Sequence, residues 1–406
     1  MPKKRVKTIV LAFSGGLDTS YCVPYLREKL GARVVTVTVD TGGFSPAGLK
    51  AVARRAKKLG AVRHHAVDAR RQVWDGFLSR IIKGNCLRGG VYPLSVSAER
   101  TAQAVAVVAI ARRERAYAVA HGSTGAGNDQ VRFDLAFGAL APDLEVLAPI
   151  RDLGLSREEE CRYVAERGVL LPPKTSRYSI NAGLCGITIG GGETHDPWAA
   201  PAEEAFPTTV DPKRSPAAGI SLVLGFDRGV PVRLNGRRLN GVALITQLAR
   251  IGARHGVGRG IHLGDTILGI KGRIAFEAPG PLIAIAAHRE LEKLVLTAMQ
   301  QQWKNQTGEA YGQLLHAGLY FDPVRKDLEA LIDSSQETVT GEVRVRLRHG
   351  QILIEGVKSP HSLMAGRVAT YGEQNRLWSA RDAAGFCRLY GLQGRIAALR
   401  KGGRRP

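Results

Sequence analysis

The sequence is poor in cysteine, and nothing in it suggests a paired disulfide or metal motif. Its five cysteines are scattered over 406 residues, and no two of them are spaced as Cys-x-x-Cys. An odd, scattered set argues against a disulfide framework and against a zinc ribbon. No apolar run reaches the roughly 18 residues that a membrane span requires. The apolar part of the basic N-terminus is too short for a signal peptide. We therefore expect a cytoplasmic protein that does not cross a membrane and holds no metal in a cage of its own side chains.

Acidic and aromatic residues are also scarce. There are 36 acidic against 58 basic residues, which gives a formal net charge of +22, and only 6% of the residues are aromatic. The basic residues cluster at positions 54–58, 112–115 and 400–405. Aromatic residues are not interleaved with these clusters, as a stacking surface for nucleic acid requires. We therefore expect small anionic molecules, and not nucleic acid, as the main partners.

Strands alternate with helices over the first 166 residues. β-branched and apolar runs predict strands, and apolar residues at helical spacing predict helices between them. This alternation is typical of a doubly wound parallel sheet in an α/β domain. The predicted strands are 6–13, 33–40, 61–68, 116–120 and 144–150, and the predicted helices are a segment ending at Gly31, 46–59, 95–114 and one beginning after the Ser156–Glu159 capping box.

The texture changes after about residue 167, where prolines punctuate a loop-rich stretch. Alternating segments then predict hairpins, the first with Asn235-Gly236 near its turn. Residues 167–378 are thus expected to form a second, α+β domain, and residues 379–406 a basic helical arm. The hairpins are predicted at 220–236 and 337–357, and the helices at 241–256, 283–303 and 379–399.

Two polar, glycine-rich loops each follow a predicted strand. They read SGGLDTS, from Ser14, and HGSTGAGNDQVRF, from His121. Because the carboxyl ends of parallel strands meet at one edge of a sheet, we expect the loops to share one site. Gly15 and Gly16 allow backbone N–H groups to approach a phosphate closely, at the start of a helix. The first loop lacks the lysine of a P-loop.

SGGLDTS resembles the pyrophosphate loop of the ATP pyrophosphatase superfamily, and residues 7–378 as a whole resemble the argininosuccinate synthase family. The blocks YSIN, PVRLNG, HGVGR and GIKGRIAFEAPG follow in that family's order. The resemblance implies an adenine nucleotide alpha hydrolase-like domain, a synthetase domain and a homotetramer joined by the C-terminal arm. It also implies a ligase of arginine biosynthesis that condenses citrulline with L-aspartate. The reaction uses ATP and Mg²⁺, passes through a citrullyl-adenylate, and releases AMP and diphosphate.

The resemblance also implies roles for individual residues. Asp18, Arg100 and Asp129 are expected to be catalytic, with Asp18 placing Mg²⁺ through the phosphates. Arg132 is expected to pair with a carboxylate of the acceptor. The expected ATP-binding residues are Ala12, Phe13, Ser14, Gly15, Gly16, Leu17, Asp18, Thr19, Ser20, Val39 and Gly122. The expected substrate-binding residues are Tyr92, Ser97, Thr124, Asn128, Asp129, Arg132, Ser179, Thr188, Gly264 and Phe276.

The chain departs from the family pattern where the amine end of citrulline is expected. An acid of the family is replaced by Gly264, a tyrosine by Phe276 and a serine by Thr188, and the lysine of the second loop by Ala126. Two interpretations remain open: drift within a divergent subfamily, or an altered acceptor such as an N-acylated citrulline. The high positive charge also leaves an alternative function open, that of a tRNA-modifying ATP pyrophosphatase forming lysidine or thiouridine.

Overall fold

Five parallel strands form the sheet of the first half of the chain. The computed structural model describes residues 7–170, 177–364, 368–372 and 377–401. The strand order is β3-β2-β1-β4-β5, so the direction of winding reverses between β1 and β4. All neighbouring strands pair in parallel, which confirms the predicted doubly wound sheet. The strands are β1 (Thr8–Ala12), β2 (Arg33–Asp40), β3 (Arg63–Asp68), β4 (Ala118–Ala120) and β5 (Glu145–Leu147).

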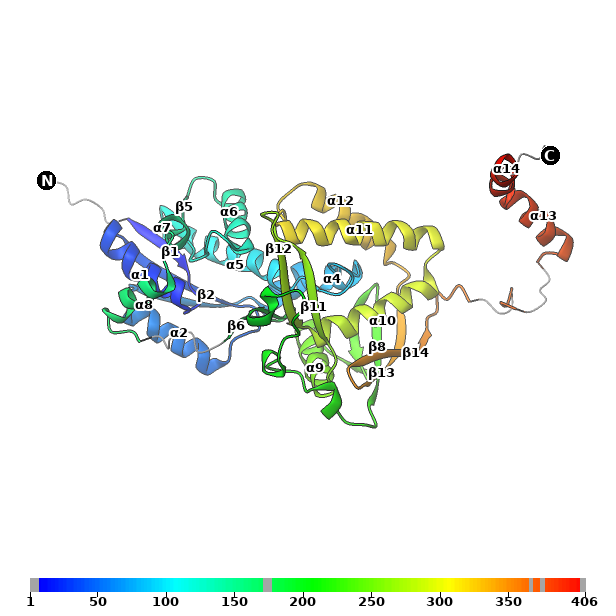
Figure 1. Ribbon diagram of the computed structural model, residues 1–406, viewed down its shortest axis with the longest axis horizontal. Helices are drawn as coiled ribbons and strands as arrows, with labels where there is room; N and C mark the ends of the chain where they lie inside the picture. The colour runs from blue at the N-terminus through cyan, green and yellow to red at the C-terminus, as the bar shows by residue number, and fades with distance from the viewer. Residues whose placement is uncertain (1–6, 171–176, 365–367, 373–376, 402–406) are drawn as a thin grey trace. The chain divides into compact units, whose positions relative to one another are not determined.

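Helices cover both faces of this sheet (Figure 1). Side chains alternate along a strand, so Ile9 and Leu11 pack toward α1, α2, α7 and α8, whereas Val10 packs toward α5 and α6. The predicted helix ends are confirmed: α1 ends at Gly31 in a left-handed conformation, and Ser156 forms a capping box with Glu159. The helices are α1 (Leu17–Leu30), α2 (Pro46–Lys58), α5 (Ser95–Arg113), α6 (Asn128–Leu140), α7 (Pro149–Leu153) and α8 (Arg157–Ala165).

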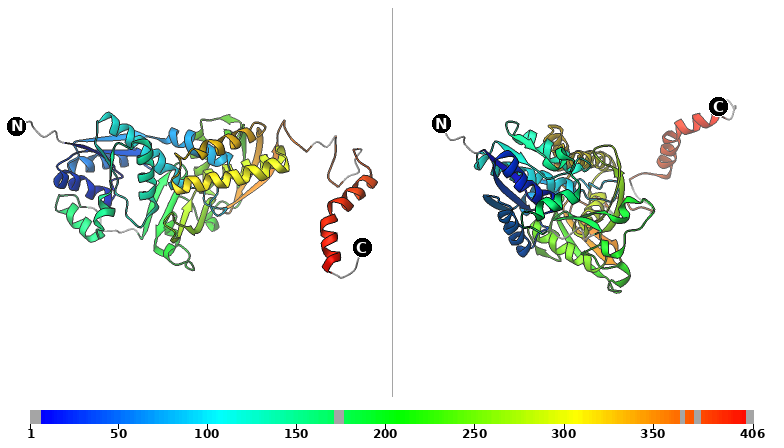
Figure 2. Two further views of the ribbon diagram at one scale, coloured as in Figure 1. Left: turned by 90° about the horizontal axis from the view of Figure 1, so that it is seen from above. Right: turned by 60° about the vertical axis from the view of Figure 1, so that its left-hand side comes forward.

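The second half contains two antiparallel sheets, with orders β10-β9-β8-β13-β14 and β11-β12-β7-β6. Strands β8 and β13 lie side by side although they are far apart in the sequence (Figures 1 and 2). The strands are β6 (Tyr178–Gly183), β7 (Gly186–Gly191), β8 (Ile220–Asp227), β9 (Val230–Leu234), β10 (Arg237–Arg238), β11 (Arg259–Asp265), β12 (Lys271–Glu277), β13 (Gly341–Arg348) and β14 (Gln351–Lys358). The α-helices are α9 (Gly241–Arg254), α10 (Pro279–Val295), α11 (Ala298–Ala317) and α12 (Val324–Ser335). Short 3₁₀ helices lie at η2 (Gly192–His195), η3 (Glu203–Ala205) and η4 (Pro212–Arg214).

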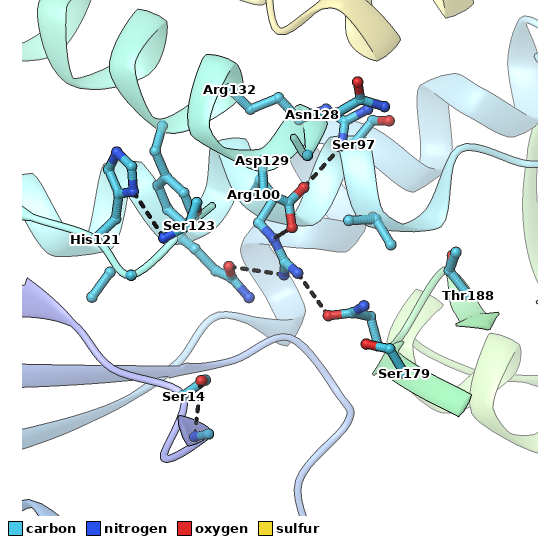
Figure 3. A pocket seen from close by; sticks show the side chains of 18 of the residues that line it. Ser14, Ser97, Arg100, His121, Ser123, Asn128, Asp129, Arg132, Ser179 and Thr188 are labelled. Carbon is cyan, nitrogen blue, oxygen red and sulfur yellow. Dashed lines mark hydrogen bonds and ion pairs between the residues drawn. The ribbon is translucent and has the colours of Figure 1, made fainter. Parts of the chain in front are cut away.

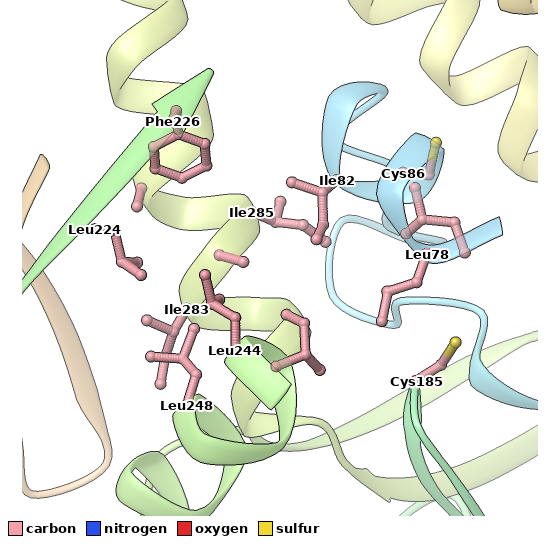
Figure 4. Packing of buried hydrophobic residues seen from close by; sticks show 14 of the residues in the cluster. Leu78, Ile82, Cys86, Cys185, Leu224, Phe226, Leu244, Leu248, Ile283 and Ile285 are labelled. Atoms are coloured by element: carbon pink, nitrogen blue, oxygen red, sulfur yellow. The ribbon is translucent and has the colours of Figure 1, made fainter. Parts of the chain in front are cut away.

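A segment between β3 and α5 contributes to the core of the second half. It consists of α3 (Arg70–Val73), the π-helical turn η1 (Trp74–Leu78) and α4 (Ser79–Lys83). Leu78 and Ile82 pack against residues of the β8 sheet and of α9 and α10 (Figure 4). Close packing of this kind joins the parallel sheet to the second half, because apolar residues of the connecting segment are buried in the core of the second half.

Two details differ from the sequence-based prediction. The β8–β9 hairpin turns at Arg228-Gly229, whose φ angles are 48° and 77°, and Asn235-Gly236 makes a second turn into β10. Both dipeptides adopt the left-handed conformations that tight hairpin turns require. The single helix predicted over 283–303 is two helices, because Thr297 caps α11 through a capping box with Gln300.

Residues 361–406 form a unit separate from residues 1–360. Its helices are α13 (Ala380–Tyr390) and α14 (Leu392–Lys401), so the predicted helix over 379–399 is interrupted at Gly391. The expected boundaries at residues 166 and 378 stay predictions. Within the described ranges, no helix combines the length and the apolar character needed to cross a membrane.

Candidate active site

The loops that follow β1 and β4 open into one cavity, at the point where the strand order of the parallel sheet reverses. The cavity has a volume of about 1000 Å³ and is lined by residues of both halves of the chain. Open α/β sheets bind ligands at this place because neighbouring loops diverge there to opposite faces. The predicted shared site is therefore present as a single cavity (Figure 3).

The first loop presents the start of α1 to the cavity. Gly16 lies at the N-cap position without a capping side chain, so the first N–H groups of α1 lack helical acceptors. The Ser14 Oγ atom accepts a hydrogen bond from the Gly16 N–H at 3.2 Å, and Thr19 Oγ1 donates to the Gly16 carbonyl at 3.3 Å. Arg55 donates to the Gly15 carbonyl from α2. Two hydroxyl groups of the loop and one arginine thus fix its backbone, and the N–H groups at the start of α1 remain available to an anion.

The second loop is held by a buried histidine. His121 Nδ1 accepts a hydrogen bond from the Ser123 N–H at 3.2 Å, so the opposite ring nitrogen carries the proton and donates to Asp134 at 2.8 Å. Arg151 donates to the other oxygen of Asp134 at 2.6 Å. Burial raises the pKa of Asp134, but His121 and Arg151 together lower it below its ordinary value. This chain of hydrogen bonds fixes the loop beside the start of α1.

Arg100 joins three walls of the cavity (Figure 3). Its Nε donates to Asp129 in α6 at 2.9 Å, and its terminal nitrogens donate to Gln103 at 3.2 Å and to Asn181 in β6 at 2.8 Å. Burial raises the pKa of Asp129, but Arg100 and Arg132 overcome this effect and lower it. Asp129 is therefore an ionised carboxylate held between two guanidinium groups.

The far end of the cavity is built around His316, at the end of α11. Arg132 donates to the His316 carbonyl at 3.1 and 3.2 Å and to Asp129 at 3.0 Å, so most of its fork is already engaged within the protein. The Nδ1 atom of His316 accepts from Arg88 at 3.0 Å and from Arg132 at 3.2 Å. Burial and these two arginines lower the pKa of His316 to about 3. The ring is therefore neutral at physiological pH.

Most of the expected site residues line this cavity. Three do not. The position of a side chain on Gly15, whose φ is 77°, would face Val52; Ser20 is buried in α1; and Phe276 packs against Tyr92 at 5.3 Å between ring centroids. Those that line it are Ala12, Phe13, Ser14, Gly16, Leu17, Asp18, Thr19, Val39, Tyr92, Ser97, Arg100, Gly122, Thr124, Asn128, Asp129, Arg132, Ser179, Thr188 and Gly264. Their individual roles stay predictions.

The sequence analysis missed several polar residues of the cavity. Asn181 could have been found, because it closes the YSIN block. His121 and Arg157 lie in segments that the sequence had already singled out, the second glycine-rich loop and the capping box at Ser156. The others come from segments with no recognisable motif, and only the packing of the two halves brings them together. They are Arg88, Gln103, His262, Asp265 and His316.

A buried carboxyl group lies directly behind the cavity. Glu99 accepts hydrogen bonds from Thr41 Oγ1 at 3.2 Å and from the Cys185 N–H at 3.3 Å. Burial raises the pKa of Glu99 to about 7, although Arg100 opposes the shift. Between pH 4.5 and 7 the unfolded chain therefore loses this proton before the folded protein does, so folding stability falls as the pH rises.

We expect Glu99→Gln to remove this pH dependence, because an amide keeps an acceptor oxygen without an ionisation step. The wild-type protein should lose up to about 3 kcal/mol more of its unfolding free energy than the variant between pH 5 and pH 8. Urea unfolding at both pH values measures this difference. Glu309→Gln, on the exposed side of α11, is the control, and equal pH dependence of Glu99→Gln and wild type would contradict the assignment.

Comparisons with known proteins match nearly the whole chain. Residues 8–170 match the family model of the arginosuccinate synthase N-terminal HUP domain, and residues 178–397 match that of its C-terminal domain. An argininosuccinate synthase of Methanocaldococcus jannaschii is 41% identical over 392 residues, covering 97% of this chain and 98% of that protein. One of Xanthomonas campestris is 41% identical over 396 residues, with coverage of 97% and 98%, and one of Pyrococcus furiosus is 39% identical over 389 residues, with coverage of 96% and 94%.

Among solved structures, the NH3-dependent NAD synthetase from Campylobacter jejuni in complex with the nitrate ion is similar to part of this chain. It has a TM-score of 0.24 and 15% identity, over 30% of this chain and 49% of that one, a likeness too slight to support an inference. The two family models and the relatives near 40% identity over almost the full length do support one. The chain belongs to the argininosuccinate synthase family.

Proposed function

We propose that this protein is an argininosuccinate synthase, a ligase that uses ATP to join a citrulline-type acceptor to L-aspartate and releases AMP and diphosphate. The observation that carries the proposal is the shared cavity, in which the open N-terminus of α1 faces the Arg100–Asp129 pair. The tRNA-modifying alternative is not favoured, because both halves of the chain match one family of small-molecule ligases.

The first loop is suited to hold the departing diphosphate. Backbone N–H groups at the start of α1, together with the Ser14 hydroxyl, offer donors without the need for a lysine. Asp18 lines the cavity beside this loop, and one carboxylate with phosphate oxygens and water is a donor set that Mg²⁺ accepts. Asp18 would hold Mg²⁺, which would neutralise charge on the leaving group.

The remaining residues position the acceptor and L-aspartate. The ureido oxygen of the acceptor forms a bond to the α-phosphorus of ATP, and the bond to diphosphate breaks. The amine of L-aspartate then attacks the ureido carbon, and AMP leaves with the ureido oxygen. Arg100 is placed to stabilise negative charge that develops on the α-phosphate. Asn128 uses its carbonyl oxygen to accept the Ile267 N–H at 2.8 Å, so its amide N–H groups remain for a substrate.

The test is a product assay with ATP, Mg²⁺, L-aspartate and citrulline or N-acyl-citrulline. We expect AMP and diphosphate as the products.

A substitution in the second loop tests the shared cavity. We expect Gly122→Val to lower kcat/KM about 100-fold. A Cβ atom at Gly122 would lie 3.0 Å from the Thr19 backbone nitrogen and so displace the first loop. Gly138→Ala, in open space on α6, should leave the rate unchanged. ADP and orthophosphate as products would refute the proposed function.

We also infer a cytoplasmic homotetramer in which residues 379–406 contact neighbouring copies. The helices of this arm expose large apolar side chains, among them Phe386, Leu389 and Tyr390, as an intersubunit contact requires. Light scattering should give a tetramer for the full chain and a smaller species after truncation at residue 378. A tetramer that survives truncation would exclude the arm as the joining element, and cell fractionation tests the location.

A further inference from the structure

One wall of the cavity is formed by β11 and β12 and carries few side chains. We call it the β11–β12 wall and define it by the cavity-lining residues of the two strands, which are His262, Gly264, Asp265, Gly272 and Ile274. Gly264 and Gly272 lie opposite each other in the antiparallel register, so the wall is bare backbone at that pair. A Cβ atom at Gly264 would lie 2.7 Å from His262 Nε2. The imidazole of His262 therefore occupies the space that a side chain at position 264 would need.

The imidazole of His262 has a nitrogen without a partner. The residue is only 8% exposed, and its Nε2 atom is buried with no hydrogen-bond partner among the described residues. The ring stacks on Tyr92, with 5.9 Å between centroids and 14° between planes. Burial, and then the charge of Arg88, lower the pKa of His262. His262 lines the cavity, and a buried imidazole nitrogen without a partner is a group for which a hydrogen-bond partner is expected.

Arg88 borders the same space. Its guanidinium lies 3.7 Å from the position that a Cβ atom at Gly264 would take. One terminal nitrogen donates to His316 Nδ1 at 3.0 Å and the other to the Asp265 carbonyl. A guanidinium has five N–H donors, so three of those on Arg88 remain for a ligand. A cation and a neutral imidazole at one place favour an oxygen acceptor, such as a carbonyl or a carboxylate.

No free carboxylate faces this space to receive an ammonium group. Among the described residues that line the cavity, three carry carboxylates: Asp18, Asp129 and Asp265. Asp129 is bound by Arg100 and Arg132, and Asp265 pairs with Lys271 at 2.6 Å. Asp18 lies in the first loop, at the start of α1. An α-ammonium group near the β11–β12 wall would thus meet the cation Arg88, and the carboxylate nearest to it, Asp265, already has Lys271 as its partner.

We propose that the acceptor of this enzyme is a ureido acid whose α-nitrogen is acylated, and that His262 and Arg88 bind an oxygen of the acyl group at the β11–β12 wall. This inference rests on the proposed function and narrows its acceptor. Acylation removes the positive charge from the α-nitrogen. It also supplies an oxygen that the two side chains can bind, and the bare backbone at Gly264 and Gly272 places no side chain of its own between the acyl group and the wall.

The experiment compares four acceptors, each with ATP, Mg²⁺ and L-aspartate, by the rate of AMP formation. They are citrulline, Nα-acetylcitrulline, Nα-succinylcitrulline and δ-ureidovalerate, which has no α-nitrogen. We expect at least one acyl derivative to exceed both citrulline and δ-ureidovalerate by roughly tenfold or more in kcat/KM. The acetyl and succinyl compounds distinguish an acyl carbonyl from an acyl carboxylate as the bound group.

Three other outcomes would contradict either the acylated acceptor or the proposed function. A kcat/KM for free citrulline equal to or above that of the acyl compounds would overturn the inference and leave the proposed function standing. Acyl compounds no better than δ-ureidovalerate would also overturn it, because the acyl oxygen would then contribute nothing. No AMP formation with any of the four acceptors would refute the proposed function and the inference with it.

A paired substitution tests the wall itself. Gly264→Glu combined with His262→Ala adds a carboxylate and clears the space it needs. We expect it to raise the citrulline to acyl-citrulline ratio of kcat/KM at least tenfold. Gly190→Ala, in open space on β7, is the control and should keep the wild-type ratio. An unchanged ratio in the double variant, with a thermal midpoint like that of wild type, would place the acceptor's α-nitrogen elsewhere.

Discussion

Lys304→Met is expected to lower the free energy of unfolding by about 3–5 kcal/mol, the largest effect on stability that we predict. Lys304 is fully buried in α11, and its Nζ donates to Glu292 in α10 at 2.6 Å. Glu292 also accepts from Gln336 at 2.8 Å and from Asn85 at 2.5 Å. Methionine fits the volume but removes the cation, so the buried carboxylate would lose its counter-charge. Urea unfolding at neutral pH measures the loss.

Two further variants separate this cause from a simple packing defect. Lys293→Met removes an exposed ion pair with Glu290 from α10 and should cost no more than about 1 kcal/mol. Adding Glu292→Gln to Lys304→Met should recover most of the lost stability, because neither charge then remains buried. A double variant as unstable as Lys304→Met alone would show that the ion pair is not the cause.

Arg100→Met is expected to lower kcat/KM by about 10³-fold or more, the largest effect on activity that we predict. The side chain supplies the cation nearest Asp129 and joins α5, α6 and β6 through its hydrogen bonds. Its loss would remove charge stabilisation at the α-phosphate and also free Asp129 and Asn181 from their fixed positions. The measurement is the initial rate of AMP formation with saturating ATP.

Two further substitutions on α5 show whether a loss of rate comes from the position and the shape of the Arg100 side chain. Arg112 lies on α5, as Arg100 does, and forms an exposed ion pair with Asp143. Arg112→Met breaks this pair and should leave the rate unchanged. Arg100→Lys keeps the charge but not the planar fork, so we expect an intermediate rate. A rate for Arg100→Met within tenfold of wild type would remove Arg100 from the list of catalytic groups.

The fold of the first half could be predicted from local patterns. Continuous β-branched runs, a glycine at the end of α1 and a capping box before α8 each act within a few residues, and all three are confirmed. The misses are also local in origin. A capping box at Thr297 divides one apolar-faced segment into two helices, and two dipeptides of similar turn-forming tendency compete for the β8–β9 hairpin. Apolar periodicity alone does not distinguish these cases.

The candidate site divides in the same way. The SGGLDTS loop can be recognised from the sequence alone, since a strand, two glycines and a helix start are adjacent in the chain. The pairing of Arg88, His262 and His316 has no such signal, because they come from three segments separated by more than fifty residues each. The position of Phe276 outside the cavity lining also has no local signal, since the strand register places its ring over Gly260 and against Tyr92.

The sequence by itself determined the parallel sheet, the two glycine-rich loops and the family, because each depends on residues that are neighbours in the chain or on blocks in a fixed order. Only the tertiary structure decided how charge is arranged in the cavity: which carboxylates are already paired, which arginine keeps free donors, and that the Nε2 atom of His262 is buried with no partner in the described part of the chain. The physical reason is that burial and counter-charges arise from contacts between distant segments, and these set the protonation and the free hydrogen-bonding groups that a substrate meets.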